Sequence, residues 1–120
     1  MIEQVQPADL EAWYANAVSA AAGSVAVVPV LLDVREPWEL QTASVTAPPD
    51  IDLVAIPMND IPARLDELDP TRPVACLCHH GARSQRVAAF LAHNGFTDVA
   101  NVVGGIDAWS VTRDGGVPRY

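Results

Sequence analysis

The chain contains no lysine, and its seven arginines are set against fifteen Asp and Glu residues. The formal net charge is therefore −8 at pH 7. A surface of this sign repels phosphate backbones and anionic lipid headgroups, so the composition argues against binding to nucleic acid or to a membrane surface. Any anionic substrate must be attracted by a local field rather than by the molecule as a whole.

No apolar run in the chain is long enough to cross a bilayer, although half of the 120 residues are hydrophobic. The first residues, Met1 to Gln4, lack the basic start and the apolar core of a signal peptide. We therefore expect a soluble, cytoplasmic protein. A chain of this length can bury one hydrophobic core, so residues 1–120 are expected to form a single domain.

Only two cysteines are present, Cys76 and Cys78, and they are too close in sequence to cross-link a domain. With His79 and His80 they could suggest a metal site. However, neighbouring residues of a strand point to opposite faces, and the ligand spacing of structural zinc sites is missing. We therefore expect neither a metal ion nor another cofactor.

Short apolar runs and helical spacing alternate along the chain. The apolar runs predict strands at residues 2–5, 30–34, 51–57, 74–77 and 99–103. Helical spacing and capping residues predict helical segments at residues 7–22, 37–40, 60–68, 83–93 and 106–109, and Gly23 and Ser24 are expected to end the first of them. Residues 41–50 have no periodicity and contain Pro48 and Pro49, so they are expected to form a loop.

Strands that alternate with helices predict an α/β fold, with a parallel sheet and helices on both of its faces. The run Val30–Val34 agrees, because a strand without polar alternation is buried on both sides. Asp33 and Arg35 lie at the C-terminal end of this run, the edge at which open α/β sheets place their sites. They fit either a direct catalytic role or a structural ion pair that braces the loop, and we favour the ion pair.

The segment Cys78–Ser84 follows a predicted strand and leads into the helix predicted from Arg83. The first N–H groups of a helix have no partner within it, and the aligned peptide dipoles leave partial positive charge at that end. Such an end binds anions, and a cysteine held over it is favoured as a thiolate, with Arg83 adding to the effect. Gly81 suits a tightly curled loop, because glycine adopts the required backbone angles without strain.

Three motifs of the chain resemble the single-domain rhodanese family, and they occur in the family's order. They are Asp33-Val34-Arg35-Glu36, Cys78-His79-His80-Gly81-Ala82-Arg83-Ser84 and Val103-Gly104-Gly105-Ile106-Asp107-Ala108-Trp109. The resemblance covers nearly the entire chain. It implies an open five-stranded parallel sheet flanked by helices, with a catalytic cysteine at the carboxyl end of a central strand.

The resemblance also implies roles for individual residues. Cys78 would be the nucleophile that accepts a sulfane sulfur and becomes a persulfide, and Ser84 would donate a hydrogen bond towards that sulfur. Backbone N–H groups around the outer sulfur would come from His79, His80, Gly81, Ala82 and Arg83. Arg83 would also add positive charge and hold the loop, supported by Asp33 and Arg35. The two histidines are expected to shape the loop and its rim rather than to act as general bases, since a thiolate needs none.

The reaction that the resemblance implies is two displacements on one sulfur atom. The Cys78 thiolate attacks the outer sulfur of a donor such as thiosulfate, and sulfite leaves. An acceptor such as cyanide or a thiol then removes the sulfur, so that a covalent intermediate divides the transfer into two easier steps. The expected partners are therefore a small sulfur donor and a cyanide or thiol acceptor, with a protein sulfur acceptor as a further candidate.

One segment departs from the family's pattern. Members of the family carry His-Ile-Pro-Gly-Ala after the Asp-Val-Arg-Glu motif, and residues Gln41 to Asp50 lack it. The rim beside the catalytic loop is therefore expected to be built differently, which bears on the choice of donor and acceptor.

Other interpretations of the cysteine loop stay open. Phosphatases and arsenate reductases of related fold have a similar loop, with five residues between Cys and Arg. Four residues separate Cys78 from Arg83 here. The shorter loop suits a single sulfur atom better than a phosphate. The presence of Cys78, Gly81 and Arg83 argues against a non-catalytic rhodanese module. The sequence does not distinguish a free-standing catalyst from a persulfide carrier that a partner loads. The remaining alternative is a thiol that lies at a strand end without any catalytic role.

Overall fold

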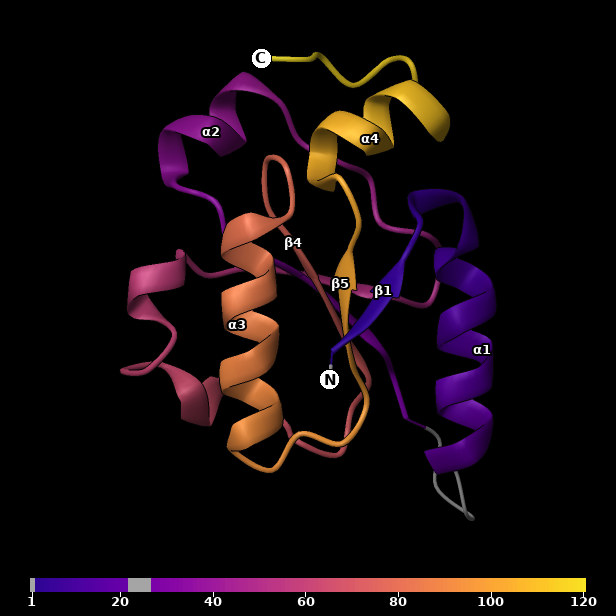
Figure 1. The fold of residues 1–120 in the computed structure, drawn as a ribbon, viewed down its shortest axis with the longest axis vertical. Helices are drawn as coiled ribbons and strands as arrows, with labels where there is room; N and C mark the ends of the chain where they lie inside the picture. The colour runs from indigo at the N-terminus through magenta and orange to yellow at the C-terminus, as the bar shows by residue number, and fades with distance from the viewer. Residues whose placement is uncertain (1, 22–26) are drawn as a thin grey trace.

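Five strands form one parallel sheet, in the order β1-β5-β4-β2-β3 (Figure 1). The computed structural model describes residues 2–21 and 27–120, so the helix end expected at Gly23 and Ser24 lies outside the described residues. The strands are β1 (Glu3–Val5), β2 (Val30–Asp33), β3 (Asp52–Ala55), β4 (Val74–Leu77) and β5 (Val99–Val102). The predicted α/β class and five-stranded parallel sheet are therefore confirmed, and no strand end differs from the predicted one by more than two residues.

Helices connect the strands and flank the sheet. The α-helices are α1 (Leu10–Ala21), α2 (Pro37–Thr42), α3 (Ala82–His93) and α4 (Gly105–Thr112), and the short 3-10 helices are η1 (Pro7–Asp9), η2 (Met58–Asp60) and η3 (Leu65–Glu67). In Figure 1, α1 and α3 lie on either side of the strands, whereas α2 and α4 lie close to each other at one end of the molecule. Within residues 2–21 and 27–120, no helix is long and apolar enough to cross a membrane.

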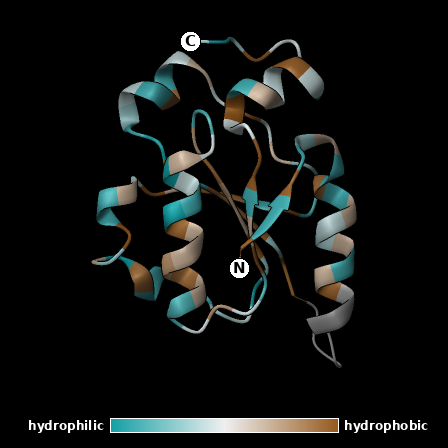
Figure 2. Ribbon diagram, viewed as in Figure 1, coloured by the Kyte–Doolittle hydropathy of each residue, from teal (hydrophilic) through white to brown (hydrophobic). Residues whose placement is uncertain are grey.

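Side chains that alternate along the strands build a core on each face of the sheet. Leu32 and Cys76 pack with Leu91 of α3, while Leu31 packs on the opposite face with Trp109 of α4. Figure 2 shows the matching pattern on α3, where hydrophilic and hydrophobic residues succeed one another along the ribbon. The two apolar faces explain why neither side of β2, β4 or β5 carries exposed residues, and they confirm the prediction of helices on both faces.

The register of the central strands brings two predicted motifs to the same edge. Asp33 of β2 pairs with Leu77 of β4, and the N–H of Val34 donates to the carbonyl of Leu77 at 2.9 Å. Because parallel strands end at the same edge, the residues that follow β2 and β4 leave the sheet side by side. α2 and α3 begin there, a few residues beyond the strand ends.

The α-helix predicted at residues 60–68 is wrong. The segment instead begins at the last residue of η2 and runs through a turn into η3, and it is closed mainly by i to i−3 hydrogen bonds such as Arg64 N–H to Ile61 O at 3.2 Å. Pro62 has no N–H to donate to the carbonyl of Met58, so η2 does not continue into an α-helix through an i to i−4 hydrogen bond at this position. Ile61 and Leu68 are nevertheless buried, as their spacing predicts.

The loop predicted at residues 41–50 is largely present. Its first two residues belong to α2, which ends at Thr42. Ala43 and Val45 are buried in the core on the α1 and α4 side of the sheet, so the loop is packed against the domain rather than projecting from it.

Candidate active site

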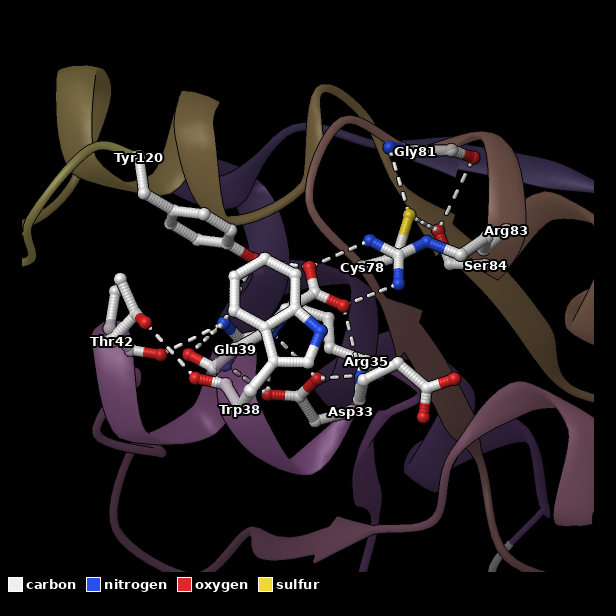
Figure 3. A network of polar contacts seen from close by, with 12 residues as sticks. Asp33, Arg35, Trp38, Glu39, Thr42, Cys78, Gly81, Arg83, Ser84 and Tyr120 are labelled. Carbon is white, nitrogen blue, oxygen red and sulfur yellow. Dashed lines mark hydrogen bonds and ion pairs between the residues drawn. The ribbon is translucent and has the colours of Figure 1, made fainter.

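Cys78 directly follows β4, and only 1% of the residue is exposed. Its Sγ accepts a hydrogen bond from the N–H of Gly81 at 3.0 Å and lies 3.2 Å from Ser84 Oγ. Figure 3 shows the sulfur pointing towards these two residues. The structure therefore brings Cys78, Gly81 and Ser84 together at the start of α3, as the strand, loop and helix pattern predicts.

The backbone at Gly81 allows the tight curl of the loop. Gly81 is the N-cap of α3 and has φ of 109°, a left-handed conformation that other residues adopt only with strain. This geometry aims its N–H at Sγ and its carbonyl towards α3, where the N–H of Gln85 donates to it at 3.2 Å. Ala82 then begins the helix on an exposed surface.

The first turn of α4 holds the other side of the loop. The N–H of Ile106 donates to the carbonyl of Cys78 at 2.8 Å, and the N–H of Asp107 donates to the carbonyl of His79 at 3.2 Å. A β carbon at Gly105 would lie 2.4 Å from the Cys78 carbonyl oxygen, so this approach requires glycine. The turn predicted at Gly104 and Gly105 is therefore present, and it also anchors the loop that carries the cysteine.

Arg83 is tied to α2 by a bidentate ion pair. Its Nη1 lies 2.6 Å from Glu39 Oε1, and its Nη2 lies 2.8 Å from Glu39 Oε2 (Figure 3). The hydrogen bonds from Arg83, more than that from the hydroxyl of Tyr120, lower the pKa of the buried Glu39 carboxyl to about 2 although burial opposes them. Arg83 therefore links the loop to α2. Its positive charge is compensated by the ionised carboxylate of Glu39.

Asp33 and Arg35 form a buried ion pair beside this link. Arg35 has no exposed surface, and its Nε and Nη2 donate to the carboxylate of Asp33, the Nη2 bond being 2.7 Å long. Its Nη1 donates to the carbonyls of Glu39 and Ala43 and to the hydroxyl of Tyr120. These contacts hold α2 at Glu39 and at its C-cap residue Ala43, which agrees with the interpretation of the pair as a structural brace.

His79 and His80 form part of an aromatic rim. The ring of His79 is stacked between Tyr120, at a centroid distance of 3.8 Å, and His80, at 3.9 Å. Trp38 of α2 meets the edge of Tyr120 at 6.0 Å and is 61% exposed. The rim therefore joins the loop, α2 and Tyr120, and Trp38 offers an apolar surface to solvent.

Cys76 lies two residues before Cys78 and is fully buried in the sheet. Burial raises the pKa of its thiol, which makes it a poor nucleophile. In the described part of the chain, no three His, Cys, Asp or Glu side chains are grouped so that they could hold a metal ion.

Three residues of the site were not predicted from the sequence. Glu39 pairs with Arg83, and Tyr120 stacks on the ring of His79. Asn101 of β5 contacts Ser84 and Gly81. Of these, Asn101 carried a usable signal, because it is the one polar residue in the apolar run at 99–103. Such a residue is costly to bury unless it is hydrogen-bonded.

The fold and the loop define a class of protein that the comparisons also identify. The family model "Rhodanese-like domain" matches residues 14–112. A "Sulfurtransferase" from Allochromatium vinosum is 36% identical over 81 residues, covering 68% of this chain and 71% of the relative. A "Thiosulfate sulfurtransferase GlpE" from Pseudomonas syringae pv. syringae is 35% identical over 83 residues, covering 69% of this chain and 74% of that one.

A solved structure supports the same assignment. The crystal structure of a rhodanese-related protein from Thermoplasma volcanium has a TM-score of 0.71 and 26% identity, and covers 92% of this chain and 93% of its own. The chain described here belongs to the rhodanese-like domain family.

Proposed function

We propose that this protein is a sulfurtransferase that carries a sulfane sulfur on Cys78 as a persulfide, taking it from a donor such as thiosulfate and passing it to cyanide or a thiol. The observation that carries the proposal is the position of the Cys78 sulfur at the start of α3, where the N–H of Gly81 donates to it at 3.0 Å. The names of the sulfurtransferase relatives support the same class of reaction.

The proposed reaction proceeds in two steps. The Cys78 thiolate attacks the outer sulfur of thiosulfate, the bond between the two sulfurs of the donor breaks, and sulfite leaves with the electron pair. Cys78 then carries a persulfide whose outer sulfur is negative. Cyanide or a thiolate attacks this outer sulfur, the bond to Sγ breaks, and its electron pair restores the Cys78 thiolate while thiocyanate or an acceptor persulfide leaves.

The loop residues would stabilise the anion on the transferred sulfur. The N–H groups at the start of α3 and in the loop supply partial positive charge without a metal ion, in a setting where little water competes. His79 and His80 would shape the wall of the loop. Arg83 would hold its shape through Glu39, and the Asp33 and Arg35 pair would keep α2 in position for that contact.

A second candidate function is a persulfide carrier that a partner protein loads. Two observations favour it: Cys78 is only 1% exposed, and the charge of Arg83 is compensated by Glu39, so Arg83 attracts a small dianionic donor less strongly than an unpaired arginine would. A partner could supply contacts of its own, for instance to the exposed Trp38.

Thiocyanate formation from thiosulfate and cyanide tests the main proposal. The wild-type protein should form thiocyanate, and Cys78→Ser should reduce the rate to background because serine does not form a persulfide. Equal rates for the two proteins would refute the assignment. A carrier would be recognised by sulfur uptake from an organic persulfide together with little turnover of thiosulfate.

A further inference from the structure

Asn101 places a buried amide against the catalytic loop. It is 4% exposed and lies on β5, whose other residues are apolar. Its Nδ2 donates to the carbonyl of Gly81 at 3.2 Å and to Gln4 Oε1 at 3.0 Å, while its Oδ1 lies 2.5 Å from Ser84 Oγ. The amide therefore touches both residues that surround the Cys78 sulfur, Gly81 and Ser84.

The chemistry of these partners fixes the direction of each hydrogen bond. The carbonyl of Gly81 can only accept, so the NH2 group of Asn101 must face it. The Oδ1 of Asn101 then faces Ser84, and because an amide oxygen can only accept, the hydroxyl of Ser84 must donate.

Ser84 has one hydroxyl proton and three acceptors within reach. They are Asn101 Oδ1 at 2.5 Å, Cys78 Sγ at 3.2 Å and the carbonyl of Gly81 at 3.3 Å. The amide oxygen is the nearest and, compared with a neutral sulfur, the stronger acceptor. With its proton on Asn101, Ser84 offers lone pairs to Cys78, which suits the S–H of a thiol and not the lone pairs of a thiolate.

We propose that Asn101 is a positioning residue that holds the Ser84 proton away from Cys78, and so favours the states in which Sγ is neutral over the bare thiolate. One such state is the thiol. The other, which rests on the proposed function, is the persulfide, because its negative charge lies on the outer sulfur and Sγ is bonded twice. A thiolate can recruit the Ser84 proton only by leaving the Asn101 oxygen without a donor, which is costly in a buried site.

Other charged and titratable groups surround the sulfur and stay unchanged in the variants described next. From the loop and the packed elements they are Arg83 with Glu39, Arg35 with Asp33, the thiol of Cys76, and His79 and His80 near Asp107. A shift between variants therefore reports on Asn101 and Ser84.

The pH profile for alkylation of Cys78 by iodoacetamide tests the proposal, with the modified residue identified by peptide mass. In Asn101→Leu the Ser84 hydroxyl is free to donate its proton to the Cys78 thiolate. The midpoint of the alkylation profile should therefore move to lower pH by about 0.5 to 1 unit, as expected for one hydrogen bond. In the Asn101→Leu background, Ser84→Ala should move the midpoint back up. The matched control is Gln85→Ala, which removes only the outer contact to Gln4 and should leave the midpoint unchanged.

A midpoint that stays or rises in Asn101→Leu would overturn the proposal, because it would mean that Asn101 only anchors Gly81. Ser84→Ala alone provides a second test, which does not depend on how well Asn101→Leu folds. If Asn101 holds the proton, this variant should not raise the midpoint, and a rise of half a unit or more would contradict the proposal.

The alkylation test needs no sulfur donor, so its result is independent of the proposed function. The persulfide is tested separately, by the fraction of protein that retains a sulfur after incubation with thiosulfate. That fraction should be lower for Asn101→Leu than for the wild type. Absence of sulfur on the wild-type protein would instead count against the proposed function and leave the alkylation result to decide the role of Asn101.

Discussion

At the scale of single residues, Glu39 explains how the loop that carries Cys78 is attached to the rest of the site. It binds Arg83 through both carboxylate oxygens and accepts a further hydrogen bond from Tyr120. A buried carboxylate with these partners is stabilised in its charged form, and the folded structure then depends on that charge.

The stability contributed by Glu39 should depend on pH. Its pKa falls from 4.5 to about 2, chiefly through Arg83, so the contribution is complete above pH 4.5 and is lost as the pH falls through about 2. We expect Glu39→Gln to lower the free energy of unfolding by about 2 kcal/mol at pH 6, and by roughly half as much at pH 3. Urea unfolding at both pH values measures the difference.

The control for this prediction is Glu67→Gln, which removes the corresponding partner of Arg64 in an exposed ion pair. Exposed pairs contribute little to stability, so this variant should match the wild type at both pH values. A loss for Glu39→Gln that is the same at pH 6 and pH 3 would mean that the charge of Glu39 is not what stabilises the fold.

The residues of the loop were predictable because their signal is local. Cys78, Gly81 and Ser84 lie within seven consecutive residues, and a loop that runs directly into a helix places them together. Asn101 and Tyr120 make their contacts with residues 17 and 81 positions away, Ser84 and Glu39 respectively. No spacing rule connects residues so far apart, so these contacts became visible only in the folded chain.

At the scale of elements, the packing of α4 against the loop that carries Cys78 leaves no room for a side chain at Gly105. Gly105 has φ of 60°, and a β carbon there would lie 2.4 Å from the Cys78 carbonyl and 2.5 Å from that of His79. Both atoms belong to the backbone, so neither can move aside without displacing the loop.

Gly105→Ala should therefore lower the free energy of unfolding by about 2 to 3 kcal/mol, through the strained φ and the close contact together. It should also slow sulfur uptake by about tenfold or more, because the sulfur and its donors are no longer aligned. Gly115→Ala is the control, since a β carbon there meets nothing within 4 Å. Equal stability of the two variants, measured by urea unfolding, would show that the loop can accommodate a β carbon at Gly105.

Elements with a single physical explanation were predicted correctly, and ambiguous ones were not. The buried runs of β2, β4 and β5 are short and rich in valine, which favours a strand covered on both faces over a helix, and α3 has both a helical spacing and Gly95 beyond its end. The segment at 60–68 buries Ile61 and Leu68 equally well in a helix or in 3-10 turns, so spacing alone could not distinguish them.

At the scale of the whole molecule, strand order decides where the cysteine emerges. β4 is the middle strand of the sheet, between β5 and β2, so Cys78 leaves the sheet next to the residues that follow both neighbours. Strand and helix alternation predicts a parallel sheet but not this order. The resemblance to the rhodanese family predicted that the strand before Cys78 is central. The structure adds the elements beside the loop that carries Cys78, which are α2 on one side and the start of α4 on the other.

The most direct test of the central claim is the intact mass of the protein after incubation with thiosulfate and removal of excess donor. We expect the wild-type protein to gain the mass of one sulfur atom and to lose it on addition of cyanide, while Cys78→Ser gains nothing. A wild-type mass that stays unchanged with thiosulfate and also with an organic persulfide donor, or an equal gain by Cys78→Ser, would contradict the claim that Cys78 carries the transferred sulfur.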